Sequence, residues 1–267
     1  MGRILSVIAT LLLLPLYVWA TPPLKVLVSI PPYRQLVQHL GSPHVIVDVL
    51  LPSNASDEVF DPTAIMLQKM ATTHIFVTTG KLPLEKVLLS RMSQLNPHLM
   101  IVNLSKFHKN AEDPHLWLSL KNLQQALDPI TQALIALDPA HRKDYLKNNQ
   151  ITRAQLTQLD QKLTQLLASK KGKGFLILHP TLGYFAKDYG LVQLAIHPIE
   201  GQSPSIGGLR STLKRANELH VKVSILQPDT PQKADWQRHT RLLKFNPMAA
   251  DITAQLQYLA TQFRATL

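Results

Sequence analysis

Cysteine is absent from all 267 residues of the chain. No disulfide can therefore stabilise the fold, which must rely on its hydrophobic core, and a chain of this length can bury enough apolar surface for that. The absence also excludes a lipid-modified cysteine at the end of a leader peptide. After the first twenty residues, no segment approaches the roughly 18 apolar residues that a membrane-spanning helix needs. We therefore expect the remainder to be soluble.

The first twenty residues have the pattern of a secretory signal. Arg3 precedes an apolar run over 4–14, Pro15 ends that run, and small residues precede a cleavage point after Ala20. An uncleaved membrane anchor is the alternative. Export without a lipid-carrying cysteine predicts a free protein in the periplasm rather than a lipoprotein.

The formal net charge is +11, and the basic residues are spread along the chain. Their densest cluster, Lys170-Lys171-Gly172-Lys173, falls at a turn between predicted elements. A basic surface can attract nucleic acid or anionic lipid. Because the chain is expected to be exported, no nucleic-acid partner is predicted, and a solvated basic face is the simplest interpretation.

Short apolar runs alternate with amphipathic segments in the first half of the chain. This alternation predicts an α/β lobe with a mainly parallel sheet and flanking helices. The expected strands are 24–30, 45–51, 73–78 and 99–104, and the expected helices are 33–40, 63–70 and 84–92.

The pattern changes to long helices in the middle of the chain. From Leu120, apolar residues recur three and four apart, with Pro129 expected to kink or divide the segment. Asp138-Pro139 has the composition of a helix start, with the aspartate as cap. A helix from there to about Ser169 would be about 45 Å long and could form a rigid spine between two lobes.

The α/β alternation then resumes, which predicts a second lobe. The expected strands are 175–178, 191–196, 223–226 and 242–245, and the expected helices are 184–189, 206–220, 232–241 and 249–264. The predicted organisation is a signal peptide over 1–20, a first lobe over 21–118, a helical linker over 119–171 and a second lobe over 172–267.

Three polar clusters follow predicted strands, where open α/β sheets bind their ligands. "LPSNASDEVFDP" carries Asp57, Glu58 and Asp61; "AEDPHLW" carries His115; and "LILHPTLGYF" places His179 at the end of a strand. A carboxylate and two imidazoles meeting between the lobes would suit zinc, manganese or ferrous iron. Each cluster alone also has an ordinary structural explanation: a helix cap at Asp61, a solvated acid at Glu58, and histidines at a surface corner and a strand end.

In this order, the motifs resemble the metal-binding receptors of bacterial ABC importers, the zinc- and manganese-type solute-binding family. The first cluster resembles that family's first ligand loop, "DPHLWLSL" its second and "LILHPTLGYFAKDYGL" its third. "HPIEGQSPS" and "ILQPDTP" resemble later landmarks of the family. The resemblance covers nearly all of the chain after the leader and implies two α/β lobes joined by one long helix.

Carried over residue by residue, the resemblance implies a changed set of metal ligands. His115 and His179 occupy the second and third ligand positions, and Glu58 stands where a histidine is usual. Asn246 stands where the family often has an acidic ligand, with Asp229 as a less well aligned candidate. The histidine-rich loop of many zinc receptors is absent. A carboxylate in place of an imidazole makes the set of metal ligands chemically harder, which favours manganese or iron without excluding zinc.

The expected function is therefore a monomeric, non-enzymatic periplasmic receptor that binds a divalent metal and delivers it to an ABC permease. Two alternatives stay open. Two histidines and a carboxylate also form catalytic zinc sites, although neither an H-E-x-x-H run nor a G-x-S-x-G elbow is present. The second alternative is a member with a decayed metal site that acts as an adhesin or scaffold.

Overall fold

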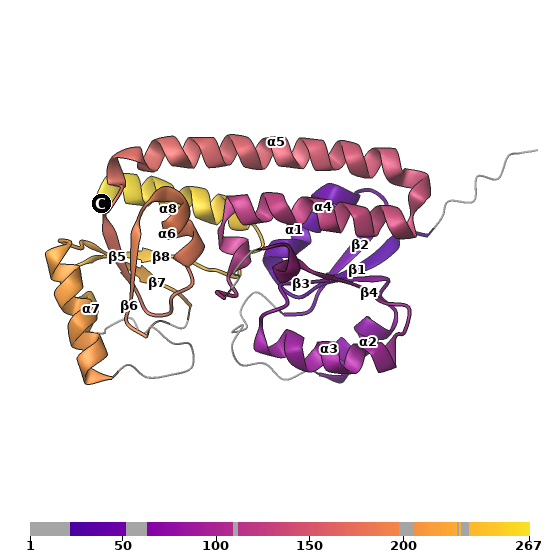
Figure 1. Ribbon diagram of the computed structural model, residues 1–267, viewed down its shortest axis with the longest axis horizontal. Coiled ribbons are helices and arrows are strands. Elements are labelled where there is room, and N and C mark those ends of the chain that lie inside the picture. The colour runs from indigo at the N-terminus through magenta and orange to yellow at the C-terminus, as the bar shows by residue number, and fades with distance from the viewer. Residues whose placement is uncertain (1–21, 52–62, 109–111, 198–204, 229, 231–234) are drawn as a thin grey trace, which may run out of the picture.

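The computed structural model of the protein describes residues 22–51, 63–108, 112–197, 205–228, 230 and 235–267. Two lobes lie side by side beneath one long helix, each built on a four-stranded parallel sheet (Figure 1). Among the described residues, no helix combines the length and the apolar character needed to cross a membrane.

The sheet of the first lobe has the strand order β2-β1-β3-β4. Its strands are β1 (Leu24–Val28), β2 (Val45–Val49), β3 (Ile75–Thr78) and β4 (Met100–Asn103). β1 pairs with β2 from Leu24↔Val45 and with β3 from Val26↔Ile75, while β3 pairs with β4 from Ile75↔Met100. Helix α1 (Pro31–Gly41) covers one face, and α2 (Ala64–Ala71) and α3 (Pro83–Leu95) cover the other.

The second lobe repeats this arrangement with the order β6-β5-β7-β8. Its strands are β5 (Gly174–Ile177), β6 (Val192–Ala195), β7 (Val223–Leu226) and β8 (Arg241–Lys244). β5 pairs with β6 from Gly174↔Val192 and with β7 from Leu176↔Ser224. Helices α6 (Gly183–Tyr189) and α8 (Ile252–Thr266) lie on the side of the spine, and α7 (Ile206–Glu218) lies on the far side.

Two helices connect the lobes: α4 (Leu120–Leu137) and the spine α5 (Arg142–Leu167), whose 26 residues span about 39 Å. α5 contacts α1 and α4 at one end and α6 and α8 at the other, so it bridges both lobes. Pro129 does not divide α4, which continues through it along the surface of α5. One hydrophobic cluster runs through both lobes and the helices between them.

Two local expectations were wrong. Asp138 does not cap the spine helix: its carboxylate accepts the Tyr145 hydroxyl at 2.6 Å, a short 3₁₀ turn (Pro139–His141) follows, and α5 begins only at Arg142. The helix expected over 232–241 is also absent from its described part, which holds a single 3₁₀ turn over Asp235–Gln237. There the backbone N–H of Arg241 bonds to the Lys222 carbonyl at 2.7 Å, so the chain enters β8 beside β7 instead.

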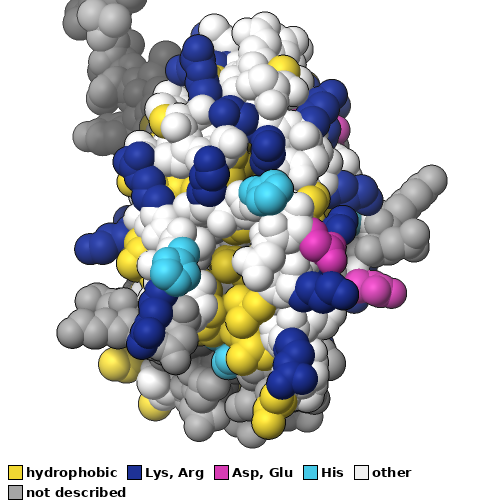
Figure 2. Space-filling model, turned by 90° about the vertical axis from the view of Figure 1, so that its left-hand side faces the viewer, with side chains coloured by type: hydrophobic (Ala, Val, Ile, Leu, Met, Phe, Trp, Pro, Cys, Tyr) yellow, Lys and Arg dark blue, Asp and Glu magenta, His cyan; other side chains and the backbone are white. Residues whose placement is uncertain are grey.

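The end of the second lobe farthest from the first carries many more Lys and Arg side chains than Asp and Glu side chains (Figure 2). They are scattered over this face with other side chains between them rather than gathered into one stripe. This distribution agrees with a solvated basic face.

Candidate metal site

His115 sits on the irregular corner that the Asp113-Pro114 pair was expected to form. It directly precedes a 3₁₀ turn over Leu116–Leu118 and is only 2% exposed, so it is not a surface histidine. Asp113 Oδ1 lies 2.7 Å from His115 Nδ1 and accepts the backbone N–H of His115 at 2.9 Å. Because an ionised carboxylate only accepts hydrogen bonds, this contact places the ring proton on Nδ1 and the lone pair on Nε2. A histidine held in this way is prepared to ligate a metal through Nε2.

The second lobe approaches this corner closely. The Tyr184 hydroxyl donates to the Asp113 carbonyl at 3.2 Å, and a Cβ added to Gly183 would lie 2.8 Å from Asp113 Oδ2. Burial and the nearby carboxylates of Asp113 and Glu112 raise the pKa of Tyr184, which keeps its hydroxyl proton available for this bond. Gly183 begins α6, four residues after His179, so the loops that carry the two histidines meet here.

Trp117 anchors the same corner to a third loop. Its ring is fully buried, and its Nε1–H donates to the Pro247 carbonyl at 2.7 Å. Pro247 follows Asn246 in the loop after β8. The corner of His115 thereby contacts the loops after β5 and β8, which both leave the carboxyl edge of the second sheet.

His179 lies two residues beyond β5 and is half-buried. Gln227, at the end of β7, fixes its loop: Oε1 accepts the backbone N–H of His179 at 3.4 Å, and Nε2 donates to Thr181 Oγ1 at 3.0 Å. The His179 ring stands perpendicular to the ring of His197, with centroids 5.5 Å apart.

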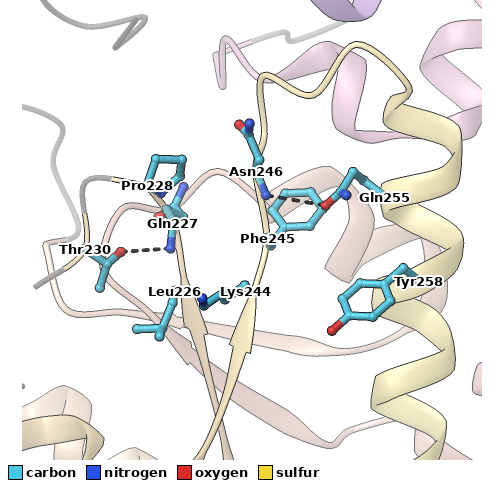
Figure 3. Close-up of a pocket in the computed structure, with 9 residues that line it drawn as sticks. All are labelled: Leu226, Gln227, Pro228, Thr230, Lys244, Phe245, Asn246, Gln255 and Tyr258. Atoms are coloured by element: carbon cyan, nitrogen blue, oxygen red, sulfur yellow. Dashed lines mark hydrogen bonds between the residues drawn. The ribbon is translucent and has the colours of Figure 1, made fainter. Parts of the chain in front are cut away.

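Asn246 lies just past the end of β8, as the alignment of motifs predicted. Its side-chain oxygen accepts the backbone N–H of Met248 at 2.9 Å, and its backbone N–H points to Gln255. It borders a cavity of about 530 Å³ that is also lined by Gln227, Lys244 and Tyr258. In Figure 3 the Asn246 side chain rises from the strand end, away from Tyr258. His115 and His179 are not among the lining residues of this cavity, so the cavity itself is not the metal site.

The other two predicted ligands, Glu58 and Asp229, fall outside the described residues. Within the described part of the chain, no three His, Cys, Asp or Glu side chains are arranged to hold a metal ion together. The structure thus brings the loops of His115, His179 and Asn246 into contact, and whether these residues ligate a metal stays a prediction.

Reasoning from the sequence missed three residues around the site. Asp113 could have been found, because an aspartate two residues before a histidine can bond to its backbone and its ring. Gln227 and His197 gave no local signal. Their positions depend on which strand ends lie side by side in the sheet.

Comparisons with known proteins identify the family of this chain. The profile of the family described as "ZnuA: Zinc-uptake complex component A periplasmic" matches residues 26–264. The chain belongs to this family. Accordingly it is a metal-binding solute receptor of the periplasmic zinc-uptake type and not an enzyme, which removes the hydrolase alternative.

Similar proteins include a putative metal-binding protein of Chlamydia trachomatis, 26% identical over 90% of both chains. The high-affinity zinc uptake system protein ZnuA of Bacillus subtilis is 30% identical over 71% of this chain and 65% of its own length. A crystal structure of ZnuA superposes with a TM-score of 0.84 at 27% identity, over 91% of this chain and 99% of that one. The two-lobe fold and the joining helix are therefore confirmed.

Proposed function

We propose that this zinc-uptake family member captures a divalent transition metal between its two lobes in the periplasm and delivers it, as a monomer, to an ABC permease. The observation that carries the proposal is the preparation of His115 by Asp113 within a corner that both lobes contact. The names of the similar uptake proteins support the metal and the transporter as partners. The cargo is zinc, manganese or iron.

The proposed ligands are His115 and His179, with Glu58 from the first-position loop and Asn246 at the end of β8. His115 comes from the first lobe and His179 from the second, so a metal that binds both would link the lobes. The long spine α5 packs against helices of both lobes, which limits wide hinge opening. Release to the permease would then depend on loop movements or small shifts between the lobes.

Metal binding by the stripped protein tests this function. Equilibrium dialysis against zinc, manganese and ferrous iron should show uptake by the parent protein. His115→Ala and His179→Ala should each weaken binding at least about tenfold, since loss of an outer-shell partner alone typically costs that much. His239→Ala, an exposed histidine of the second lobe, is the control for loss of an imidazole far from the site.

Glu58→Gln belongs to the same experiment. It keeps the size of the side chain and removes the negative charge, so affinity should fall for every metal if Glu58 is a ligand. If the parent protein takes up none of the three metals at metal concentrations below about 10 μM, its dissociation constant is larger than that of high-affinity metal sites in proteins. This result would contradict the proposed function. That result would favour the adhesin or scaffold alternative.

A further inference from the structure

His197 lies beside His179 because of the register of two neighbouring strands. β5 and β6 pair up to Ile177↔Ala195. The pairing continues past both strands, since the N–H groups of Ile196 and His197 donate to the carbonyls of Ile177 and Leu178 at 2.9 Å. His197 is therefore the pairing partner of His179 at the carboxyl edge of the sheet. Side chains of paired residues in a parallel sheet point to the same face.

The distance between the rings of His179 and His197 fits coordination of one metal ion by both. Zinc binds imidazole nitrogen at about 2.0–2.1 Å with tetrahedral angles, which puts the centroids of two coordinated rings about 5 Å apart. The centroids of His179 and His197 are 5.5 Å apart, with the ring planes at 88°. Simple edge-to-face packing would produce a similar arrangement, so the geometry permits both and experiment must separate them.

The residues at the ends of the neighbouring strands β7 and β8 are weak metal ligands, so a metal at this edge of the sheet would gain from another nitrogen donor. The residues at the ends of β7 and β8, Gln227 and Asn246, carry neutral amides. Gln227 uses both of its side-chain atoms on the loop of His179, and Asn246 Oδ1 accepts the Met248 N–H. Imidazole is a better donor to transition metals than either amide.

We infer that His197 is an additional ligand from the second lobe, paired with His179. The described histidines are not grouped around one point, so metal binding would draw the His115 corner toward this pair to complete a set of three imidazoles. This inference rests on the proposed function and names its cargo more narrowly. The third imidazole replaces the nitrogen lost where Glu58 stands in place of the usual histidine. Nitrogen-rich coordination favours zinc over manganese, so the chain is a zinc receptor despite the acidic residue in its first ligand loop.

X-ray absorption spectroscopy of the zinc-loaded protein gives a direct count of imidazole ligands. The parent protein should show three, and His197→Ala should show two. In competitive titrations, His197→Ala and His197→Gln should each lose at least about tenfold in zinc affinity, with a smaller loss for manganese. His239→Ala should match the parent in both measurements. The count on the unaltered protein needs no variant, so it holds even if a substitution disturbs folding.

The outcomes separate this inference from the function on which it rests. If His115→Ala and His179→Ala lose zinc while His197→Ala keeps the parent's affinity and count, His197 is only a packing neighbour. The inference is then overturned and the receptor function stands. A parent protein with no zinc bound would overturn both.

Discussion

Oδ1 of Asp113 lies 2.7 Å from Nδ1 of His115 and accepts the backbone N–H of the same residue. One carboxylate therefore fixes both the ring and the backbone of the residue expected to bind the metal. Tyr184 of the second lobe donates to the Asp113 carbonyl, and a side chain at Gly183 would meet the Asp113 carboxylate. The position of that lobe therefore also affects the orientation of the ring. The two lobes are thus coupled at the site itself.

Asp113→Asn should weaken metal binding about tenfold to hundredfold, the usual cost of losing a partner of a ligating histidine. The amide can no longer hold the Nδ1–H tautomer through a charged acceptor. Nitrogen NMR of His115 should show a mixture of ring tautomers, which a purely structural role would not produce. Glu112→Gln, a neighbouring exposed position with the same change of charge, is the control. Unchanged affinity and tautomer in Asp113→Asn would show that the contact does not prepare His115.

Asn246→Asp tests whether the loop after β8 reaches the metal. Aspartate keeps the acceptor for the Met248 N–H and adds a hard, charged donor, so binding should tighten about tenfold for manganese and less for zinc. Gln255→Glu adds the same charge to the same cavity from α8 and is the control. Competitive titration measures both. An equal gain in the two variants would indicate long-range attraction instead of ligation.

The sequence predicted the sheets better than the helix ends. Buried parallel strands read as apolar runs, and β3, buried at every position, shows why this signal was strong. Asp138 was misassigned because local composition favoured a cap, whereas the buried Tyr145 hydroxyl provided a tertiary partner. The helix expected over 232–241 was wrong, whereas the strand expected over 242–245 is present as β8 and begins one residue earlier, where Arg241 pairs with Val223 of β7.

The candidate site was predictable only as separate motifs. His115, His179 and Asn246 could each be named from their positions after strands. The partnership of His179 with His197 could not, because it depends on the register between β5 and β6. The close approach of the Asp113 carboxylate to the position of Gly183 could not be foreseen either, because it depends on how the two lobes meet.

Glu85 stabilises the first lobe through a network unrelated to metal. It is fully buried, and its carboxylate accepts the N–H groups of four consecutive residues and one hydroxyl, contributed by Thr79, Gly80, Lys81 and Leu82 at 2.5–3.1 Å. Burial, and then repulsion by Glu85, raise the pKa of Tyr33 well above its ordinary range, which keeps that buried hydroxyl neutral.

Glu85→Ala should lower the free energy of unfolding by about 3 kcal/mol, because it leaves several buried donors without an acceptor. Glu85→Gln keeps one acceptor oxygen and should have an intermediate effect. Glu218→Ala removes an exposed carboxylate paired with Arg215 at 2.9 Å and should change stability by less than about 1 kcal/mol. Urea denaturation measures all three. Equal losses in Glu85→Ala and Glu218→Ala would contradict the role assigned to the network.

Asp138 joins the start of the spine helix to the first lobe through charged and aromatic partners. Its Oδ2 lies 2.6 Å from both the Tyr145 hydroxyl and His141 Nδ1. The His141 ring stacks on His44 at 3.5 Å, and His44 in turn contacts Asp144 at 3.0 Å. Burial would raise the pKa of the Asp138 carboxyl, but the hydrogen bonds from Tyr145 and His141 and the charges of the two imidazoles outweigh it and lower the pKa.

A lowered pKa in the folded state means that the folded protein binds a proton at Asp138 less readily than the unfolded chain does. The resulting stability is fully present above the ordinary pKa of about 4 and is lost as the pH falls through the lower, folded-state value. Asp138→Asn should therefore be less stable than the parent at pH 7 and should lose less stability between about pH 5 and pH 2. Asp48→Asn, an exposed carboxylate on the edge strand β2, is the control. Denaturation curves recorded across this pH range measure the free energy of unfolding of all three proteins. If it falls equally steeply with decreasing pH in Asp138→Asn and in the parent, Asp138 contributes nothing to the pH dependence of stability.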